Sequence, residues 1–126
     1  MKSLRLLPDV LGLQPGTVNV VLFSQAGCEF CAEVREHYLK PLLATRPRRV
    51  VIAEFELDGT RRLRDWSRRE LTQADFARAN RARFAPTLMF FGARGQTLAE
   101  PIVGMSRDFF GAYLDERIAA ALRAAA

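Results

Sequence analysis

The two cysteines of this 126-residue chain, Cys28 and Cys31, are separated by only two residues. They follow an apolar, β-branched run at 18–23 and precede a stretch with helical periodicity, so the pair is expected where a strand ends and a helix begins. Two cysteines at this spacing can close a disulfide, and the free N–H groups of a helix N-terminus stabilise the thiolate of the first one. We therefore predict a redox-active pair in which Cys28 is the nucleophile.

Other uses of a cysteine pair fit the sequence less well. A structural zinc site needs four ligands, and the chain offers one further candidate, its single histidine His37. Covalent haem attachment requires a histidine directly after the second cysteine, where this chain has Ala32. No metal and no organic cofactor is therefore expected. A purely structural disulfide, or two ordinary buried thiols, stays open as the alternative.

The composition is that of one globular domain spanning residues 1–126, with 49% hydrophobic and 26% charged residues. No apolar run approaches the roughly 20 residues that cross a bilayer. The segment 1–10 begins basic, but Arg5, Pro8 and Asp9 interrupt it before an apolar core of signal-peptide length can form. The residues alone leave two locations open: the cytoplasm, or an exported protein whose leader has been removed.

The chain is basic, with a net charge of +5, and 17 of its 19 basic residues are arginine. Five arginines cluster around Trp66 within 61–69, which could form an anion-binding patch. Because no nucleic-acid motif accompanies this charge, we expect a solvated loop and no nucleic-acid partner. A role of the segment in docking a protein partner stays open.

Strands are expected at 18–23, 49–57, 87–91 and 98–103, with the last two forming a hairpin. A helix is expected over 30–43, with Arg35 among the polar residues of its solvent side and a bend at Pro41. A short helix should begin at the capping-box-like segment 72–75. The final helix should begin at an N-cap Ser106 and present a wide apolar face, formed by Phe109, Phe110, Tyr113, Leu114, Ile118 and Leu122.

The features that carry a family resemblance are the Cys28–Cys31 motif, the kinking Pro41, the proline at the start of a strand in 85–87, and the Val103-Gly104 step before the last helix. With them, nearly the whole chain resembles the thioredoxin superfamily. It is most similar to SoxW-type bacterial thioredoxin-like proteins. The resemblance implies an α/β, thioredoxin-like three-layer fold, in which a central mixed β-sheet carries helices on both faces in the order βαβ-α-ββα.

The resemblance also implies a substrate site beside the cysteines. It makes Pro86 a cis-proline and gives the backbone of Ala85 the task of pairing with an extended substrate segment. Gly27 and Phe30 would form an apolar rim for docking, although Phe30 could equally be a core residue of the helix. The implied substrates are disulfide-containing proteins, the implied electron donor is a membrane carrier, the implied location is the periplasm, and a monomer is expected.

Three departures from the thioredoxin pattern affect the expected chemistry. Leu22 occupies the position of a buried acid, so water or another carboxylate must accept the proton of the second thiol. Glu33 is close in sequence but is expected to face solvent. Glu29, beside Cys28, disfavours the thiolate and thereby makes the disulfide a weaker oxidant, which predicts a reductase. A disulfide isomerase or oxidase, and a non-catalytic binding module, are the alternatives.

Overall fold

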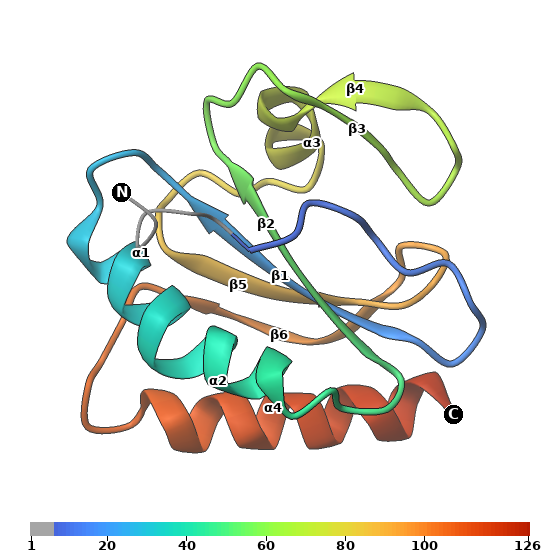
Figure 1. Ribbon diagram of the computed structural model, residues 1–126. Coiled ribbons are helices and arrows are strands. Elements are labelled where there is room, and N and C mark those ends of the chain that lie inside the picture. The colour runs from blue at the N-terminus through green and yellow to red at the C-terminus, as the bar shows by residue number, and fades with distance from the viewer. Residues whose placement is uncertain (1–6) are drawn as a thin grey trace.

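The computed structural model describes residues 7–126 and has a four-stranded sheet at its centre, in the order β2-β1-β5-β6 (Figure 1). Residues 1–6 lie outside the described residues. The expectation about a leader depends partly on them. β1 pairs in parallel with β2 and antiparallel with β5, and β5 pairs antiparallel with β6, so the sheet is mixed. The strands are β1 (Val18–Ser24), β2 (Val50–Glu56), β5 (Thr87–Phe91) and β6 (Thr97–Val103).

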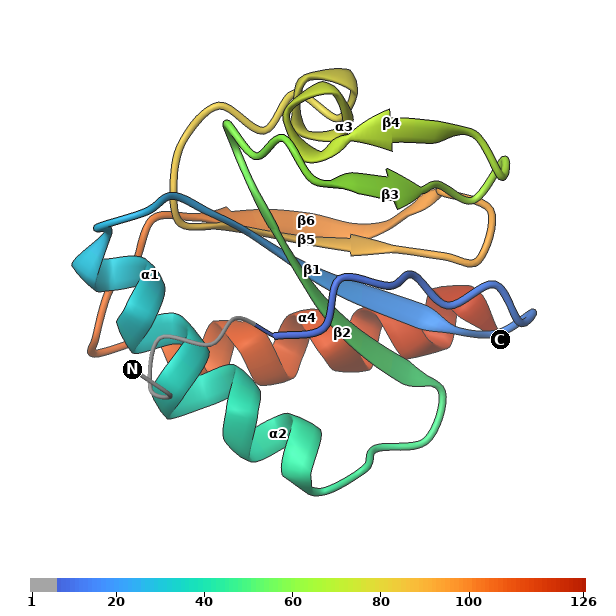
Figure 2. The ribbon, with the colours of Figure 1, turned by 45° about the horizontal axis from the view of Figure 1, so that its top comes forward.

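Helices cover both faces of this sheet (Figures 1 and 2). One face carries the long C-terminal helix α4 and the helical run that follows the cysteines. The other face carries α3 and a small two-stranded sheet. The bounds are α1 (Glu29–Val34), the π-helical η2 (Arg35–Leu39), α2 (Lys40–Ala44), α3 (Gln73–Ala79), α4 (Phe110–Ala125), β3 (Arg62–Arg64) and β4 (Glu70–Thr72). The predicted α/β three-layer fold is confirmed, with β3 and β4 as additions to the predicted order.

The central strand β1 supplies both halves of the core, because successive side chains of a strand point to opposite faces. Val20 and Leu22 pack with Phe110 and other residues of the α1–α4 layer, whereas Val21 and Phe23 pack with Phe76 of α3. All seven residues of β1 are buried. This explains why the run 18–23 is apolar except at Asn19, as expected of a strand covered on both faces.

The helix predicted over 30–43 begins one residue earlier and contains a π-helical turn, η2, just before Pro41. The π-helical turn is followed by Lys40, whose N–H donates to the carbonyl of Arg35 five residues back. Proline has no N–H, and its ring crowds the carbonyl four residues before it, so the regular ladder cannot continue through this point. The irregularity that we predicted at Pro41 therefore lies in the turn preceding it.

The basic segment 61–69 is not the solvated loop that we predicted. β3 and β4 pair antiparallel, with Leu63 opposite Leu71, and we call this segment, residues 62–72, the arginine hairpin. Leu63 is buried, and Trp66 packs against the rings of Phe76 and Phe91. The apolar side chains between the arginines anchor the hairpin, while the arginine side chains remain exposed.

The start of the last helix also differs from the prediction. α4 begins at Phe110, because residues 106–109 form a preceding turn in which the carbonyl of Ser106 accepts the N–H groups of Phe109 and Phe110. Phe109 and Tyr113 are exposed, so the apolar face is narrower than expected. The predicted cap of α3 is confirmed, since the Thr72 hydroxyl accepts the N–H of Asp75. No helix within residues 7–126 is long and apolar enough to cross a membrane.

Candidate active site

Cys28 and Cys31 form a disulfide at the end of the sheet where β1 stops. The chain leaves β1 through residues 25–27, and Gly27 adopts a φ of +76°, a left-handed conformation that favours glycine. Cys28 is the N-cap of α1, and its Sγ accepts the N–H of Cys31 at 3.1 Å. The strand-to-helix junction predicted from the sequence is therefore where the pair lies.

The two sulfur-bearing residues differ in exposure. Cys28 is half-buried and borders an open cavity, whereas Cys31 lies within α1 and is completely buried. A substrate disulfide can therefore reach Cys28 directly but not Cys31. The two sulfurs are thus unequally open to a molecule that approaches from solvent.

Ala85 and Pro86 lie at the same end of the sheet. β5 runs antiparallel to β1, so Thr87 at its start pairs with Phe23 near the end of β1. The Ala85–Pro86 peptide bond is cis, and the Pro86 carbonyl accepts the N–H of Gly104 at 2.7 Å. The proline loop is thereby fixed to the segment that enters α4, at the end of the sheet that also carries the cysteines.

The rim residues predicted beside the cysteines are accessible. Gly27 and Glu29 are exposed, and the Phe30 side chain is 52% exposed, so the alternative that Phe30 is a core residue is wrong. Glu29 lies in the first turn of α1, one residue after Cys28. The negative charge of a carboxylate at this place disfavours a thiolate at Cys28. The N–H groups at the helix N-terminus still favour that thiolate, so the two effects oppose each other.

A buried ion pair lies under the helix that carries the cysteines. Arg35 of η2 donates from Nε and Nη2 to the two carboxylate oxygens of Glu54 in β2, both at 2.8 Å. Glu54 is completely buried and Arg35 nearly so, which corrects the prediction that Arg35 faces solvent. The hydrogen bonds to Glu54 raise the pKa of Arg35 above its usual value. Burial of both charges is tolerated because each satisfies the other.

Glu54 lies directly beside Leu22 in the parallel register of β1 and β2. The buried acid that is absent from β1 is therefore present on the neighbouring strand, which the sequence analysis missed. The available signal was a carboxylate within the apolar run 50–57, since a charged residue in a buried strand requires a partner. Glu54 also accepts the N–H of Leu7 at 3.2 Å, so its carboxylate is fully engaged.

Arg35 and Cys28 line the same open cavity of about 390 Å³, which we call the cysteine cavity. It is lined by Gln25, Ala26, Gly27, Cys28, Glu29, Ala32, Arg35 and Glu56. Glu56 pairs with Ser24 at the end of the sheet and is half-buried. The cavity thus offers a carboxylate and water access beside Cys28, the two kinds of proton acceptor that the sequence left open.

Glu33 does not face solvent freely as predicted. Its carboxylate accepts from Arg107 of the segment before α4, with Nε at 2.9 Å from one oxygen, and its side chain is 22% exposed. The hydrogen bond from Arg107 holds the pKa of Glu33 below its usual value. His37 is exposed, and residues 7–126 contain no group of three or more His, Cys, Asp or Glu side chains placed to hold a metal ion.

No family model and no curated protein matches the sequence. Among solved structures, poplar thioredoxin h PtTrxh4 is 20% identical, with 85% of this chain and 78% of that chain covered and a TM-score of 0.59. Thioredoxin NaTrxh of Nicotiana alata is 16% identical, with 83% and 76% covered and a TM-score of 0.56. A structure from work on thiol resolution in a yeast mitochondrial 1-Cys peroxiredoxin is 18% identical, with 79% and 74% covered and a TM-score of 0.54. The chain has the thioredoxin fold.

Proposed function

We propose that this protein is a thiol–disulfide oxidoreductase that reduces disulfides of protein substrates. The observation that carries the proposal is the arrangement of the cysteine pair on a thioredoxin fold. Cys28 is accessible at the N-cap of a helix, and its partner Cys31 is buried one turn further on. A disulfide with only a structural task gains nothing from an accessible sulfur at a helix N-terminus, whereas a nucleophilic thiolate does.

The reaction needs no group beyond the dithiol. The Cys28 thiolate attacks one sulfur of the substrate disulfide, and the other sulfur leaves as a thiolate, which takes up a proton. Cys31 then loses its proton to water or to a carboxylate and attacks the Cys28 sulfur. This second step releases the reduced substrate and restores the Cys28–Cys31 disulfide. Two electrons have passed to the substrate, and an external dithiol donor must return them.

The direction of electron flow is argued from Glu29. Its exposed carboxylate next to Cys28 disfavours the thiolate, and a less stabilised reduced form makes the disulfide a weaker oxidant. An isomerase or oxidase would use the same residues with a different reduction potential. Equilibration in glutathione or dithiothreitol buffers, with free thiols counted, separates them: a potential near about −270 mV supports a reductase and one near about −120 mV an oxidant.

The surroundings of the pair supply the substrate site. The backbone of Ala85 positions the incoming chain and is itself held by the cis bond to Pro86, which is buried, and Gly27 with Phe30 forms the rim. On the resemblance to SoxW-type proteins, we further infer a periplasmic monomer of one domain, 1–126, fed by a membrane-bound electron donor. No nucleic acid is included among its partners. Location in the cytoplasm remains the alternative.

The activity itself is tested by insulin reduction with dithiothreitol as the electron source. Wild-type protein should accelerate precipitation of the insulin B chain, and Cys28→Ser should abolish the acceleration. Cys31→Ser should instead accumulate a mixed disulfide with the substrate, because the resolving thiol is missing. An inert wild-type protein would favour a non-catalytic binding module, for which the arginine hairpin is the docking surface to examine.

A further inference from the structure

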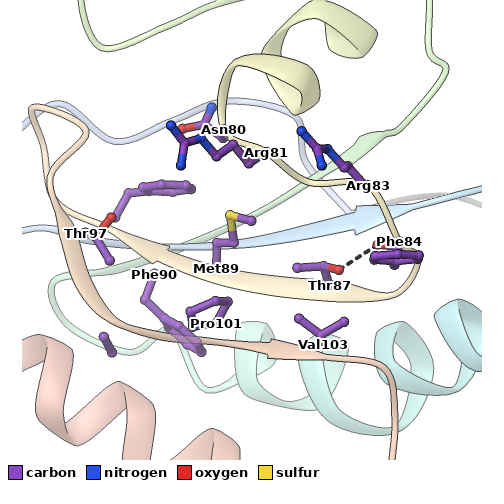
Figure 3. A pocket seen from close by; sticks show the side chains of 12 residues that line it. Asn80, Arg81, Arg83, Phe84, Thr87, Met89, Phe90, Thr97, Pro101 and Val103 are labelled. Atoms are coloured by element: carbon purple, nitrogen blue, oxygen red, sulfur yellow. Dashed lines mark hydrogen bonds between the residues drawn. The ribbon is translucent and has the colours of Figure 1, made fainter.

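A groove runs along β5 and β6 on the face of the sheet that carries α3 (Figure 3). We call it the basic groove. Its volume is about 310 Å³, and its apolar floor includes Met89, Pro101 and Val103. Arg81 and Arg83, from the segment between α3 and β5, stand along one side, as Figure 3 shows. The groove therefore combines an apolar floor with a cationic wall.

The floor is open because α3 covers only part of this face. The ring of Phe76 in α3 packs over Phe23 and Phe55, on β1 and β2, and leaves this face of β6 uncovered by any helix in residues 7–126. As a result, Val103 is 61% exposed and Phe84, at the end of the groove, is 68% exposed. Such exposed apolar residues grouped along one surface are typical of a binding surface.

The charge of the wall is uncompensated. Neither Arg81 nor Arg83 forms an ion pair within residues 7–126, and both are exposed. No Asp or Glu lines the groove. By contrast, the arginines at 62, 64 and 69 of the arginine hairpin each face a carboxylate. The basic groove is therefore complementary to an acidic partner.

Neighbouring cavities that share lining residues lead from the groove toward the cysteine pair. One end of the groove is formed by Phe84 and Thr87, which flank the cis Ala85–Pro86 bond. Arg83 also borders a second cavity that contains Gln25, and Gln25 in turn borders the cysteine cavity with Cys28. A polypeptide whose disulfide lies at Cys28 can therefore continue into the groove. Along β6, the groove extends for about 20 Å, which matches roughly six residues of extended chain.

We infer that the basic groove selects the substrate: it binds an extended, acidic segment with at least one apolar side chain, adjacent to the disulfide that Cys28 attacks. The apolar side chain lies on Met89 and Val103, and the carboxylates pair with Arg81 and Arg83. This inference rests on the proposed function, because the occupant is a redox substrate. It goes beyond that function by stating which protein disulfides are preferred.

Binding is tested first without any redox step, on the oxidised protein. The probes are two fluorescein-labelled, cysteine-free peptides, Ser-Glu-Glu-Leu-Glu-Glu and Ser-Lys-Lys-Leu-Lys-Lys, followed by anisotropy. We expect the acidic peptide to bind at least about tenfold more tightly than the basic one at low salt. The double variant Arg81→Glu/Arg83→Glu should remove this preference. Arg94→Glu/Arg123→Glu, which changes the net charge equally at two other exposed arginines, should keep it.

Reduction is tested with the same peptides carrying cysteine in place of serine, as mixed disulfides with 2-nitro-5-thiobenzoate. The acidic substrate should have the larger kcat/KM, and the Arg81→Glu/Arg83→Glu variant should lose that advantage. The variant should reduce the small neutral hydroxyethyl disulfide at the wild-type rate. Equal binding of both peptides, or a preference that survives charge reversal, overturns the inference and leaves the proposed function standing.

The converse outcome is equally distinct. If wild-type protein reduces neither insulin nor hydroxyethyl disulfide, the proposed function is overturned even where the acidic peptide binds. The groove then has no redox substrate, and the inference fails with it. Support therefore requires both the preference in binding and its transfer to the rate of reduction.

Discussion

Two regions of the molecule use arginine in opposite ways. Arg35 lies buried beneath the cysteine-bearing helix and is held by both oxygens of Glu54. In the arginine hairpin, Arg62 and Arg64 are exposed and share Glu70, which is exposed as well. The ion pair between Arg35 and Glu54 is buried away from water, whereas the side chains around Glu70 are open to water. The same ion-pair chemistry is therefore structural in one region and nearly neutral for stability in the other.

The difference lies in what remains when one partner is removed. A buried guanidinium without its carboxylate keeps its charge and has lost its solvation, which is expensive. An exposed guanidinium without its partner is simply hydrated. The hairpin accordingly depends on Leu63 and Trp66 for its attachment and not on its charges.

The largest effect is expected at Glu54. Glu54→Gln leaves the Arg35 charge buried without a counter-charge, and we expect a loss of about 3–5 kcal/mol in the free energy of unfolding, measured by urea denaturation. The control is Arg35→Met/Glu54→Leu, which removes both charges and should be more stable than the single variant. A single variant as stable as wild type would show that this pair is not effectively buried in solution.

The second prediction concerns the anchor of the arginine hairpin. Trp66→Ala removes ring contacts with Phe76 and Phe91, and because Trp66 is only partly buried we expect a cost of about 2–3 kcal/mol, below the range for fully buried aromatics. Thermal unfolding measures it. Trp66→Phe should recover most of the loss. If Trp66→Ala cost less than removal of a hairpin charge, the hairpin would be held by its ion pairs after all.

A smaller effect is expected when the hairpin charges themselves are changed. Glu70→Ala leaves Arg62 and Arg64 without their carboxylate, and since all three side chains are more than half exposed the cost should stay under about 1 kcal/mol. Urea denaturation at low and high salt provides the measurement, and high salt should shrink the difference further. A loss comparable to that of Glu54→Gln would erase the contrast between the two regions.

The smallest effect concerns the pH dependence of stability through Glu33. Arg107 lowers the pKa of Glu33 in the folded protein, so the pair stabilises the fold above the ordinary pKa of a glutamate. That contribution is lost as the pH falls through the lowered pKa. Arg107→Ala should therefore flatten the decline in stability between neutral pH and about pH 3. If the decline in stability at acid pH were the same in Arg107→Ala and wild type, the two side chains would not interact in solution.

Much of the fold could be predicted because it depends on local patterns. The run 18–23 is apolar except at Asn19, and the strand that it predicts is buried on both faces. The capping segment at Thr72 and the strand at 87–91 are likewise local features. The position of Cys28 at a helix N-terminus follows from the same neighbouring patterns, which is why the core of the candidate site was recognisable.

The errors concern residues whose surroundings come from distant segments. Arg35 is polar by type, and only the register that places Glu54 beside Leu22 gives it a buried partner. The pairing of Glu33 with Arg107 joins residues 74 positions apart. The hairpin was missed because Leu63 and Trp66 are isolated among arginines, and their packing depends on α3 and β5. The basic groove likewise exists only because α3 stops short of β6.

The placement of Trp66 has a practical consequence for spectroscopy. It is the chain's only tryptophan, and its ring closes over Gly95, in the turn between β5 and β6, so tightly that no Cβ would fit there. That turn and Cys28 lie at opposite ends of the seven-residue strand β1, about 20 Å apart. Disulfide quenching acts over much shorter ranges than this separation. The intrinsic fluorescence should therefore report unfolding of the hairpin while being nearly silent to the redox state, so that one optical signal measures stability of both forms on the same scale.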